Sequence, residues 1–399
     1  MICLSILALT ATLAPNVWPN SISKANSDPW LIENHDRIIR MQPRLLVLNF
    51  ANGLSRENAR SQVNKLIAAL SESSRYHGYK KADAPAFLEY KIHKFIDLAD
   101  SEKTVDGNSA QYPRVPNWTE GINFQYSRLF TNEFTRQYDI DDPSNRSRDL
   151  SLSELVNRGI INEVWFLAYH GKYGSPFESI EVKQVYDEQF RKVKGKSVQA
   201  GNGGDEGQPF IGRSLRILFI NVERGTGCAM ESLGHSFEGM SNSRAIPYFT
   251  KYFREYAGFD LDKEYGLPFD SLYARNGNEM NYPSPTTMSF TWEGAQRSVT
   301  NYVVAGGNVH FPPNGRRDYD TDNMQPVMST IEHYRMHDDN GKDKATLWTP
   351  KVFDRYRKLA PDCMGAWVVY WRQNMPGYRN KAKDDAGNPM KNWWPFLFY

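Results

Sequence analysis

The sequence predicts an α/β fold with a mostly parallel, doubly wound sheet and a loop-rich, aromatic C-terminal region. Three short apolar runs, at 44–50, 161–169 and 215–220, have the composition of strands that are buried on both faces. Helical patterns separate these runs, whereas regular periodicity fades beyond them. We therefore expect an α/β domain over 26–257 and a loop-rich region over 258–399 that packs on it and completes the functional site.

Helices are expected between and after these strands. Ser55 is placed to cap a helix whose apolar residues recur at helical spacing through 63–70. Further helices are predicted over 86–98, over 152–158 and over 245–257.

The remaining segments are predicted from their turn residues and aromatic content. Residues 194–212 are rich in glycine and charge and are expected to form a loop. A last helix is predicted over 350–359, and an apolar run follows at 366–370. The aromatic tail at 393–396 is expected to dock onto the body of the protein.

The first 25 residues have the features of a signal peptide. A short apolar segment, too short to span a bilayer, is followed by a polar stretch. We therefore expect a secreted, extracellular protein, and no other segment is apolar enough for a stable membrane span. Removal of residues 1–25 would leave Cys228 and Cys363, which are either paired in a disulfide or free thiols.

Composition argues against one class of partner. The 399-residue chain has a net charge of +2, so no excess of positive charge points to nucleic acid. Aromatic residues make up 13% of the sequence. This content is typical of a groove that stacks on sugars, and equally of a large core with amphipathic side chains at its rim.

Polar residues follow the second and third predicted strands directly. Ligands of open α/β sheets bind beyond the carboxyl ends of the strands, so these turns are expected to meet at one crevice. The catalytic candidates in the two turns are His170, Glu178, Glu223 and Arg224. Among these, Glu223 is expected to act as acid or base, and Arg224 to hold it ionised or to clamp an anionic substrate. The candidates for substrate binding are Tyr169, Tyr173, Asn308 and Arg316.

The helix after the third strand carries a stripe that suits a metal. Glu231, His235 and Glu238 fall within about 60° of one another on a helical wheel. With His310, they would supply the imidazole and carboxylate ligands that a divalent metal, above all zinc, prefers. The alternative is an exposed face laced with charge pairs, opposite an apolar stripe. That stripe consists of Met230, Leu233, Phe237 and Met240.

A longer pattern around this helix resembles a family of secreted or exported proteins for which the resemblance implies no reaction. Its members carry a strand ending in Tyr-Glu-Arg-Gly and a helix reading Met-Leu-Glu-x-x-Gly-His-Arg-x-Glu. The matching residues are Glu223, Arg224, Gly225, Glu231, Gly234, His235 and Glu238. The similarity extends over 45–49, 161–179 and 306–320. The chain departs at Val222, Cys228 and Ser236, where the family has Tyr, Glu and Arg, so any role of that glutamate would be lost here.

These observations favour a secreted hydrolase that acts on an extracellular polymer, peptide or glycan, and that depends on a metal. The chain lacks the G-x-S-x-G, H-E-x-x-H and phosphate-loop motifs, which argues against serine hydrolases, zincins and nucleotide-binding proteins. One alternative is a metal-free glycoside hydrolase that pairs Glu223 with Glu178 or Glu231, at about 5–9.5 Å. A second alternative is a non-catalytic protein that binds glycans or surfaces.

Overall fold

The computed structural model describes residues 28–99, 104–105, 107–109, 126–143, 149–170, 177–203, 207–338 and 341–399. The predicted signal peptide and Tyr173 lie outside these residues.

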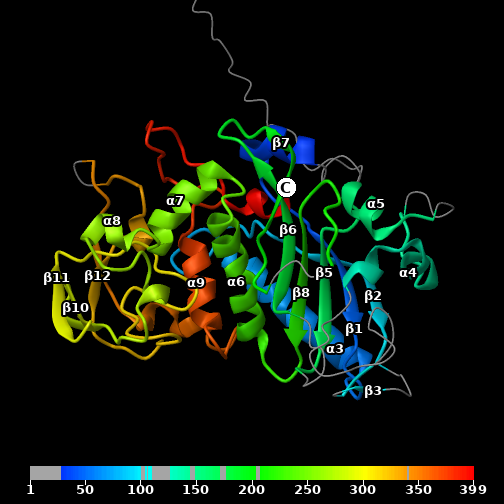
Figure 1. Cartoon of the computed structure of the whole chain (residues 1–399), viewed down its shortest axis with the longest axis horizontal. Helices are drawn as coiled ribbons and strands as arrows, with labels where there is room; N and C mark the ends of the chain where they lie inside the picture. Colours follow the sequence, from blue (N-terminus) through cyan, green and yellow to red (C-terminus); the bar gives the residue numbers. More distant parts are fainter. Residues whose placement is uncertain are drawn as a thin grey trace, which may run out of the picture.

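A six-stranded sheet in the order β2-β1-β5-β8-β6-β7 forms the centre of the molecule (Figure 1). The first four strands in this order run parallel, whereas β6 is antiparallel to β8 and β7 is antiparallel to β6. The sheet is therefore largely parallel, as predicted, and the doubly wound pattern stays a prediction. The strands are β1 (Arg44–Asn49), β2 (Lys91–Asp97), β5 (Glu163–Ala168), β6 (Ser179–Tyr186), β7 (Lys192–Gln199) and β8 (Leu215–Asn221).

Both faces of the sheet are buried, which explains why its central strands are apolar throughout. Alternate side chains such as Val47 and Trp165 join a core with helices α3, α6 and α9 on one face. Their neighbours Leu46 and Phe166 join a second core with α4 and α5 on the other face. These helices are α3 (Arg56–Ser73), α4 (Asn132–Gln137), α5 (Leu152–Asn157), α6 (Thr226–Asn242) and α9 (Gly365–Asn374).

Local signals placed the first helices correctly. The Ser55 hydroxyl accepts a hydrogen bond of 3.2 Å from the Asn58 amide and caps α3. By contrast, the helix predicted over 86–98 is wrong, because residues 91–97 form β2. Pairing with β1, which lies more than forty positions earlier (Lys91 pairs with Arg44), overrides the local pattern.

The loop predicted over 194–212 is also wrong in its first part. Residues up to Gln199 belong to β7, which pairs only with β6, a strand that the sequence reading missed. Lysines at 192, 194 and 196 lie along β7 and are exposed, as is common on the unpaired edge of a sheet.

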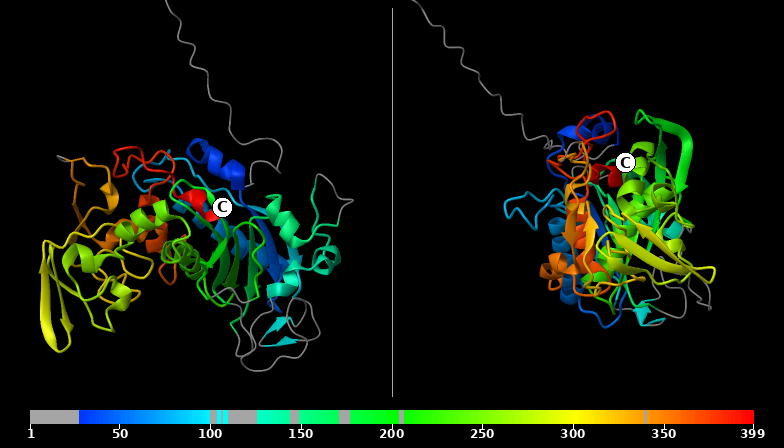
Figure 2. Two further views of the ribbon diagram at one scale, coloured as in Figure 1. Left: turned by 45° about the horizontal axis from the view of Figure 1, so that its top comes forward. Right: turned by 90° about the vertical axis from the view of Figure 1, so that its left-hand side faces the viewer.

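The region after 257 contains more regular structure than expected. Helix α7 (Pro247–Ala257) leads into two short helical segments and a three-stranded meander at the end of the molecule away from α4 (Figures 1 and 2). The helix predicted over 350–359 is a 3₁₀ helix, η5. The other elements are α2 (Asp28–Asn34), α8 (Leu261–Tyr265), β9 (Asn281–Ser284), β10 (Thr287–Trp292), β11 (Ala295–Thr300), β12 (Val327–Ser329), β13 (Thr346–Trp348), η5 (Pro350–Tyr356) and η6 (Trp394–Phe398).

The C-terminal region shares its core with the sheet. One hydrophobic cluster runs from Leu31 to Tyr399 and includes residues on both sides of position 257. The aromatic tail is docked as predicted, with Trp393, Trp394 and Phe396 buried. Figure 1 shows the C-terminus close to β6 and β7, against the body of the protein rather than projecting from it.

Two buried histidines are held neutral in this core. The Nε2–H of His35 donates to the Asn392 carbonyl, so its Nδ1 accepts from the Tyr399 hydroxyl, each at 2.6 Å. Burial lowers the pKa of His35 to about 4 and that of His77 to about 3. The neutral ring of His35 therefore ties the C-terminal tail to the start of the fold.

Acidification is expected to destabilise the protein through these two side chains. Their pKa values in the folded protein lie below the unfolded value near 6.5, so their contribution is complete above pH 6.5 and is lost as pH falls towards 4. At pH 5 the loss is about 1–2 kcal/mol for each histidine. Urea unfolding at pH 7, 6 and 5 measures it. A His35→Asn, His77→Asn variant should show a flatter dependence, and an unchanged slope would contradict the assignment.

Candidate metal centre and adjoining cavity

Three side chains from two distant parts of the chain converge beside the sheet. Glu231 and His235 lie one turn apart on α6, and His310 comes from the segment between β11 and β12. The Nε2 atoms of the two histidines are 3.2 Å apart. Glu231 Oε1 lies 2.9 Å from His310 Nε2 and 3.8 Å from His235 Nε2. Three potential ligand atoms therefore form one compact triangle.

The size of this triangle fits a small divalent cation. Zinc binds imidazole nitrogen and carboxylate oxygen at about 2.0–2.1 Å in a tetrahedral arrangement, which separates the ligand atoms by about 3.3 Å. The three observed separations of 2.9, 3.2 and 3.8 Å lie on either side of that value. The atoms could hold the ion after small side-chain movements.

Each histidine has a carboxylate on its outer nitrogen. Glu238 Oε2 lies 2.7 Å from His235 Nδ1, and Asp318 Oδ1 lies 3.5 Å from His310 Nδ1. Carboxylates in this position fix the tautomer and orientation of metal-binding histidines. The two Nε2 atoms are thereby left to face each other.

Glu238 was predicted as a metal ligand, but the structure places it behind His235. Its Oε1 accepts from the Val309 amide at 2.9 Å, and the Tyr273 hydroxyl lies 3.2 Å from both oxygens. The Oε2 atom of Glu238 contacts His235 Nδ1, which faces away from the triangle. Both oxygens of this carboxylate therefore have partners outside the triangle. Glu238 is therefore placed to orient the His235 ring and is not part of the triangle.

Close packing of Val309 against the backbone of α6 at Gly234 brings the neighbouring His310 to this helix. A Cβ atom at Gly234 would lie only 2.9 Å from a methyl carbon of Val309, so glycine gives the segment room. Asn308 shapes the turn, because its Oδ1 accepts from the amides of His310 and Phe311.

Two predicted substrate-binding residues are used within this segment. Asn308 is buried, and its carbonyl also accepts from the Trp367 indole. Arg316 donates to Asp320 from its Nε and its backbone amide, at 2.7 and 3.0 Å. The structure therefore gives both residues a part in shaping the loop that carries His310.

The pKa values of Glu231 and His235 are shifted in the directions that keep both side chains charged. Burial raises the pKa of Glu231, but hydrogen bonds from His235, His310 and Tyr319 outweigh it and lower the pKa to about 2. Burial lowers the pKa of His235, but Glu238 and Glu231 outweigh it and raise the pKa to about 10. Without a metal, the two carboxylates thus hold a proton on His235 at neutral pH.

A cavity of about 270 Å³ adjoins the cluster at the edge of the sheet. The ends of β5 and β8 reach it, and so does the start of β6, because β6 runs in the opposite direction. Its lining consists of His170, Phe177, Glu178, Phe219, Asn221, Arg224, Cys228, Ala229, Glu231 and Ser232. Three catalytic candidates from the two turns therefore share a cavity with Glu231.

Other predicted residues lie outside this lining. Glu223 is exposed, and its Oε2 accepts from the His170 amide at 3.2 Å. Tyr169 faces the loop at Asn108, which bonds both its amide and its carbonyl, and its hydroxyl donates to the Asn52 carbonyl. The exposed charged face considered as an alternative for α6 is wrong, because Glu231 and Glu238 are both only 5% exposed.

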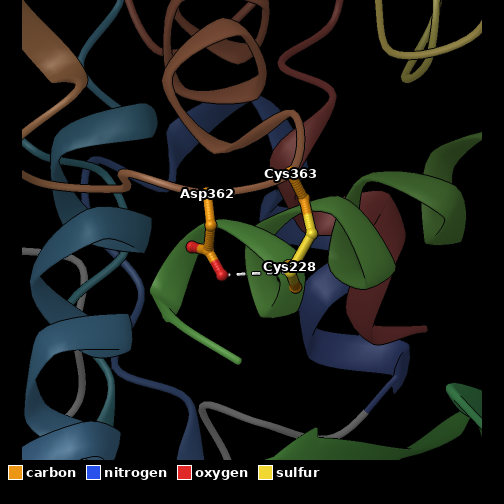
Figure 3. A group of neighbouring side chains, drawn as sticks. All are labelled: Cys228, Asp362 and Cys363. Carbon is orange, nitrogen blue, oxygen red and sulfur yellow. Dashed lines mark hydrogen bonds between the residues drawn. A yellow bond between two sulfur atoms is a disulfide. The ribbon is translucent and has the colours of Figure 1, made fainter. Parts of the chain in front are cut away.

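A disulfide anchors the helix that carries the cluster. Cys228, in the first turn of α6, is bonded to Cys363 just before α9 (Figure 3). The carboxylate of Asp362 accepts from the amides of Gly225 and Gly227, at 2.5 and 2.8 Å, and so caps the helix. A Cβ atom at Gly227 would lie 2.0 Å from the Asp362 carbonyl oxygen, so only glycine permits this approach.

The sequence reading missed the two tyrosines around the cluster. Tyr319 donates to Glu231 Oε1 at 2.6 Å, and Tyr273 contacts Glu238 from the other side. Burial, the hydrogen bond to Glu231 and the charges of Glu231 and Glu178 raise the pKa of Tyr319 above its ordinary value. Glu178 and Glu231 line the same cavity. The signal for Tyr319 was its place in the segment 306–320, which takes part in the family resemblance and also contains His310.

Comparisons with known proteins add no assignment. No protein-family model matches the chain, and a search of curated proteins found no match.

Each helix within the described residues is too short or too polar to cross a lipid bilayer.

Proposed function

We propose that the protein is a zinc-dependent hydrolase whose metal is held by Glu231, His235 and His310. The convergence of two imidazoles and one carboxylate, with a carboxylate behind each imidazole, carries this proposal. Two histidines and one glutamate are a ligand set of catalytic zinc sites, which keep a fourth position for water or substrate. A zinc ion in such a site supplies a nucleophile by lowering the pKa of its bound water.

The cavity residues are assigned the remaining roles. Glu178, which lines the cavity together with Glu231, is the carboxylate proposed to accept and return protons during hydrolysis. Arg224 is proposed to hold an anionic part of the substrate, and His170 to hydrogen-bond it. The substrate would be an extracellular polymer, peptide or glycan. Secretion is part of the proposal, and a disulfide agrees with an oxidising compartment.

A metal-free glycoside hydrolase is the second candidate. Glu178 and Glu231 line the same cavity, and such enzymes need a pair of carboxyl groups. The two imidazoles beside Glu231 favour the metal, because a glycosidase pair of carboxyl groups needs no histidine in this position. Retention of activity after complete removal of metal would favour the glycosidase.

Metal analysis tests the proposal directly. The secreted, oxidised protein should carry about one zinc per chain after dialysis, measured by plasma mass spectrometry. His310→Ala and Glu231→Gln should lose nearly all of it, while Glu223→Gln, an exposed carboxylate outside the cluster, should keep it. Circular dichroism of each variant confirms that it is folded. A wild-type protein that binds no metal, or a His310→Ala variant that keeps it, would refute the zinc site.

Zinc affinity is expected to fall as the solution becomes more acidic. The pKa of His235 is raised to about 10 in the metal-free protein, so zinc must displace a proton below that pH. The apparent Kd should rise about tenfold for each pH unit between 8 and 6, measured by competition with a chelator of known pH dependence. Glu238→Gln should weaken binding by about 10- to 100-fold and reduce this pH dependence. A Kd that does not change with pH would contradict the assignment.

A further inference from the structure

Tyr319 is the one aromatic residue of the cluster that combines an exposed ring with a hydroxyl on a proposed ligand. Tyr319 is 48% exposed. Its hydroxyl lies 2.6 Å from Glu231 Oε1, the same oxygen that faces His310 Nε2. Its ring packs on that of His310, with 4.4 Å between the ring centroids. Tyr319 therefore stands between the triangle of ligand atoms and solvent.

The backbone holds Tyr319 in this position against its own preference. Its φ of +60° lies in the left-handed region, which costs energy for a residue with a side chain and is common at functional sites. The Tyr319 amide donates to the His310 carbonyl at 3.2 Å. Ion pairs fix its two neighbours, Asp318 with Arg275 at 2.9 Å and Asp320 with Arg316 at 2.7 Å. These contacts fix the backbone on both sides of Tyr319 and so hold its side chain beside the cluster.

Tyr273 offers an internal comparison. Its ring also contacts His310, at 5.3 Å between centroids, and its hydroxyl also bonds a carboxylate of α6. That carboxylate is Glu238, which lies behind His235 and away from the triangle. The two tyrosines thus share the same chemistry but differ in which side of the cluster they face.

We infer that the Tyr319 hydroxyl donates a hydrogen bond to the oxygen atom of a substrate bound at the open position of the metal. This inference rests on the proposed zinc site. The Tyr319 hydroxyl lies 2.6 Å from Glu231 Oε1. A substrate oxygen at the fourth position of a tetrahedral zinc would lie about 3.3 Å from the same Glu231 oxygen. The hydroxyl and the substrate oxygen would therefore be close enough for a hydrogen bond. When substrate binds, the hydroxyl can turn from Glu231 to the substrate oxygen. It would then stabilise negative charge that develops there, as an oxyanion-hole donor does.

Binding of a small zinc ligand tests the inference without knowledge of the substrate. Acetohydroxamate places a negatively charged oxygen on zinc, so it should accept from the Tyr319 hydroxyl. Titration calorimetry on the zinc-loaded protein should show that Tyr319→Phe weakens its Kd by about 10- to 100-fold, since a hydrogen bond to a charged group is lost. The zinc content of this variant should equal that of the wild type.

Tyr273→Phe is the matched control, because it removes a hydroxyl from the other side of the same histidine. Its Kd for acetohydroxamate should stay within about twofold of the wild type, since only an indirect contact is lost. Equal affinity of wild type and Tyr319→Phe, with zinc bound in both, would overturn the role of Tyr319 alone. Absence of zinc from the wild type would overturn the proposed function and this inference together.

Discussion

Removal of the Cys228–Cys363 disulfide is expected to lower the free energy of unfolding by about 4–5 kcal/mol. The bond closes a loop across 135 positions, and a cross-link of this span strongly restricts the unfolded chain. The expected loss is a large part of the 5–15 kcal/mol that stabilises a typical protein. Urea unfolding of a Cys228→Ser, Cys363→Ser variant, compared with the wild type, measures it.

Reduction of the wild-type protein provides the control for this change. With dithiothreitol present, the wild type should unfold at the same urea concentration as the double variant, which should not respond to the reductant. Asp362→Ala should cost less, about 1 kcal/mol, because it removes a helix cap and leaves the cross-link in place. Equal stability of the oxidised wild type and the double variant would show that the bond does not constrain the unfolded state.

Replacement of Arg216 by methionine is expected to destabilise the protein by about 3–5 kcal/mol. Strand pairing places Arg216 between Glu163 of β5 and Glu181 of β6, and all three side chains are buried. The Arg216 Nη2 lies 3.0 Å from Glu163 Oε1, and its Nε lies 4.0 Å from Glu181 Oε2. Without the guanidinium, Glu163 loses this ion pair and retains the hydrogen bonds from the Tyr90 hydroxyl and the Trp165 indole, at 2.8 and 2.9 Å. Glu181 retains the ion pair with Lys183, at 3.7 Å.

The pH dependence of this variant separates lost charge pairing from lost packing. An unpaired buried carboxylate has a raised pKa, so the folded variant binds a proton that the unfolded chain does not. The deficit of Arg216→Met relative to the wild type should therefore shrink as pH falls from 7 to 5. Adding Glu163→Gln should recover part of the stability at pH 7. A deficit of under 1 kcal/mol, unchanged with pH, would rule out charge pairing as the cause.

Short-range patterns explain which parts of the candidate site were predictable. Glu231 and His235 belong to one helix, and their spacing of four residues places them on the same face whatever surrounds that helix. The buried strands β5 and β8, which precede the two turns, were also visible in the sequence. A sheet covered on both faces needs such continuous apolar runs. The meeting of His170 and Arg224 at this end of the sheet followed from these strands, whereas Glu178 reaches it at the start of β6, a strand that was not predicted.

Other parts depended on partners that are far away in the chain. Glu238 has the same helical spacing as a ligand, and only the approach of Val309 and Tyr273 to it commits its oxygens elsewhere. Glu223 directly follows a strand, yet the turn leaves it exposed and directs Arg224 to the cavity. Residues 91–97 became a strand because β1 offered an edge.

The sequence by itself determined three buried strands, the Ser55 cap of α3, the apolar side of α6 and the spacing of its charged residues. These features depend on neighbours within a few positions, where steric preference and burial act locally. Only the tertiary structure decided that His310 reaches Glu231 and His235, that Asp318 and Glu238 stand behind the two imidazoles, and that the Tyr319 hydroxyl contacts Glu231. Those contacts join groups up to 88 positions apart, and packing of the whole chain brings them together.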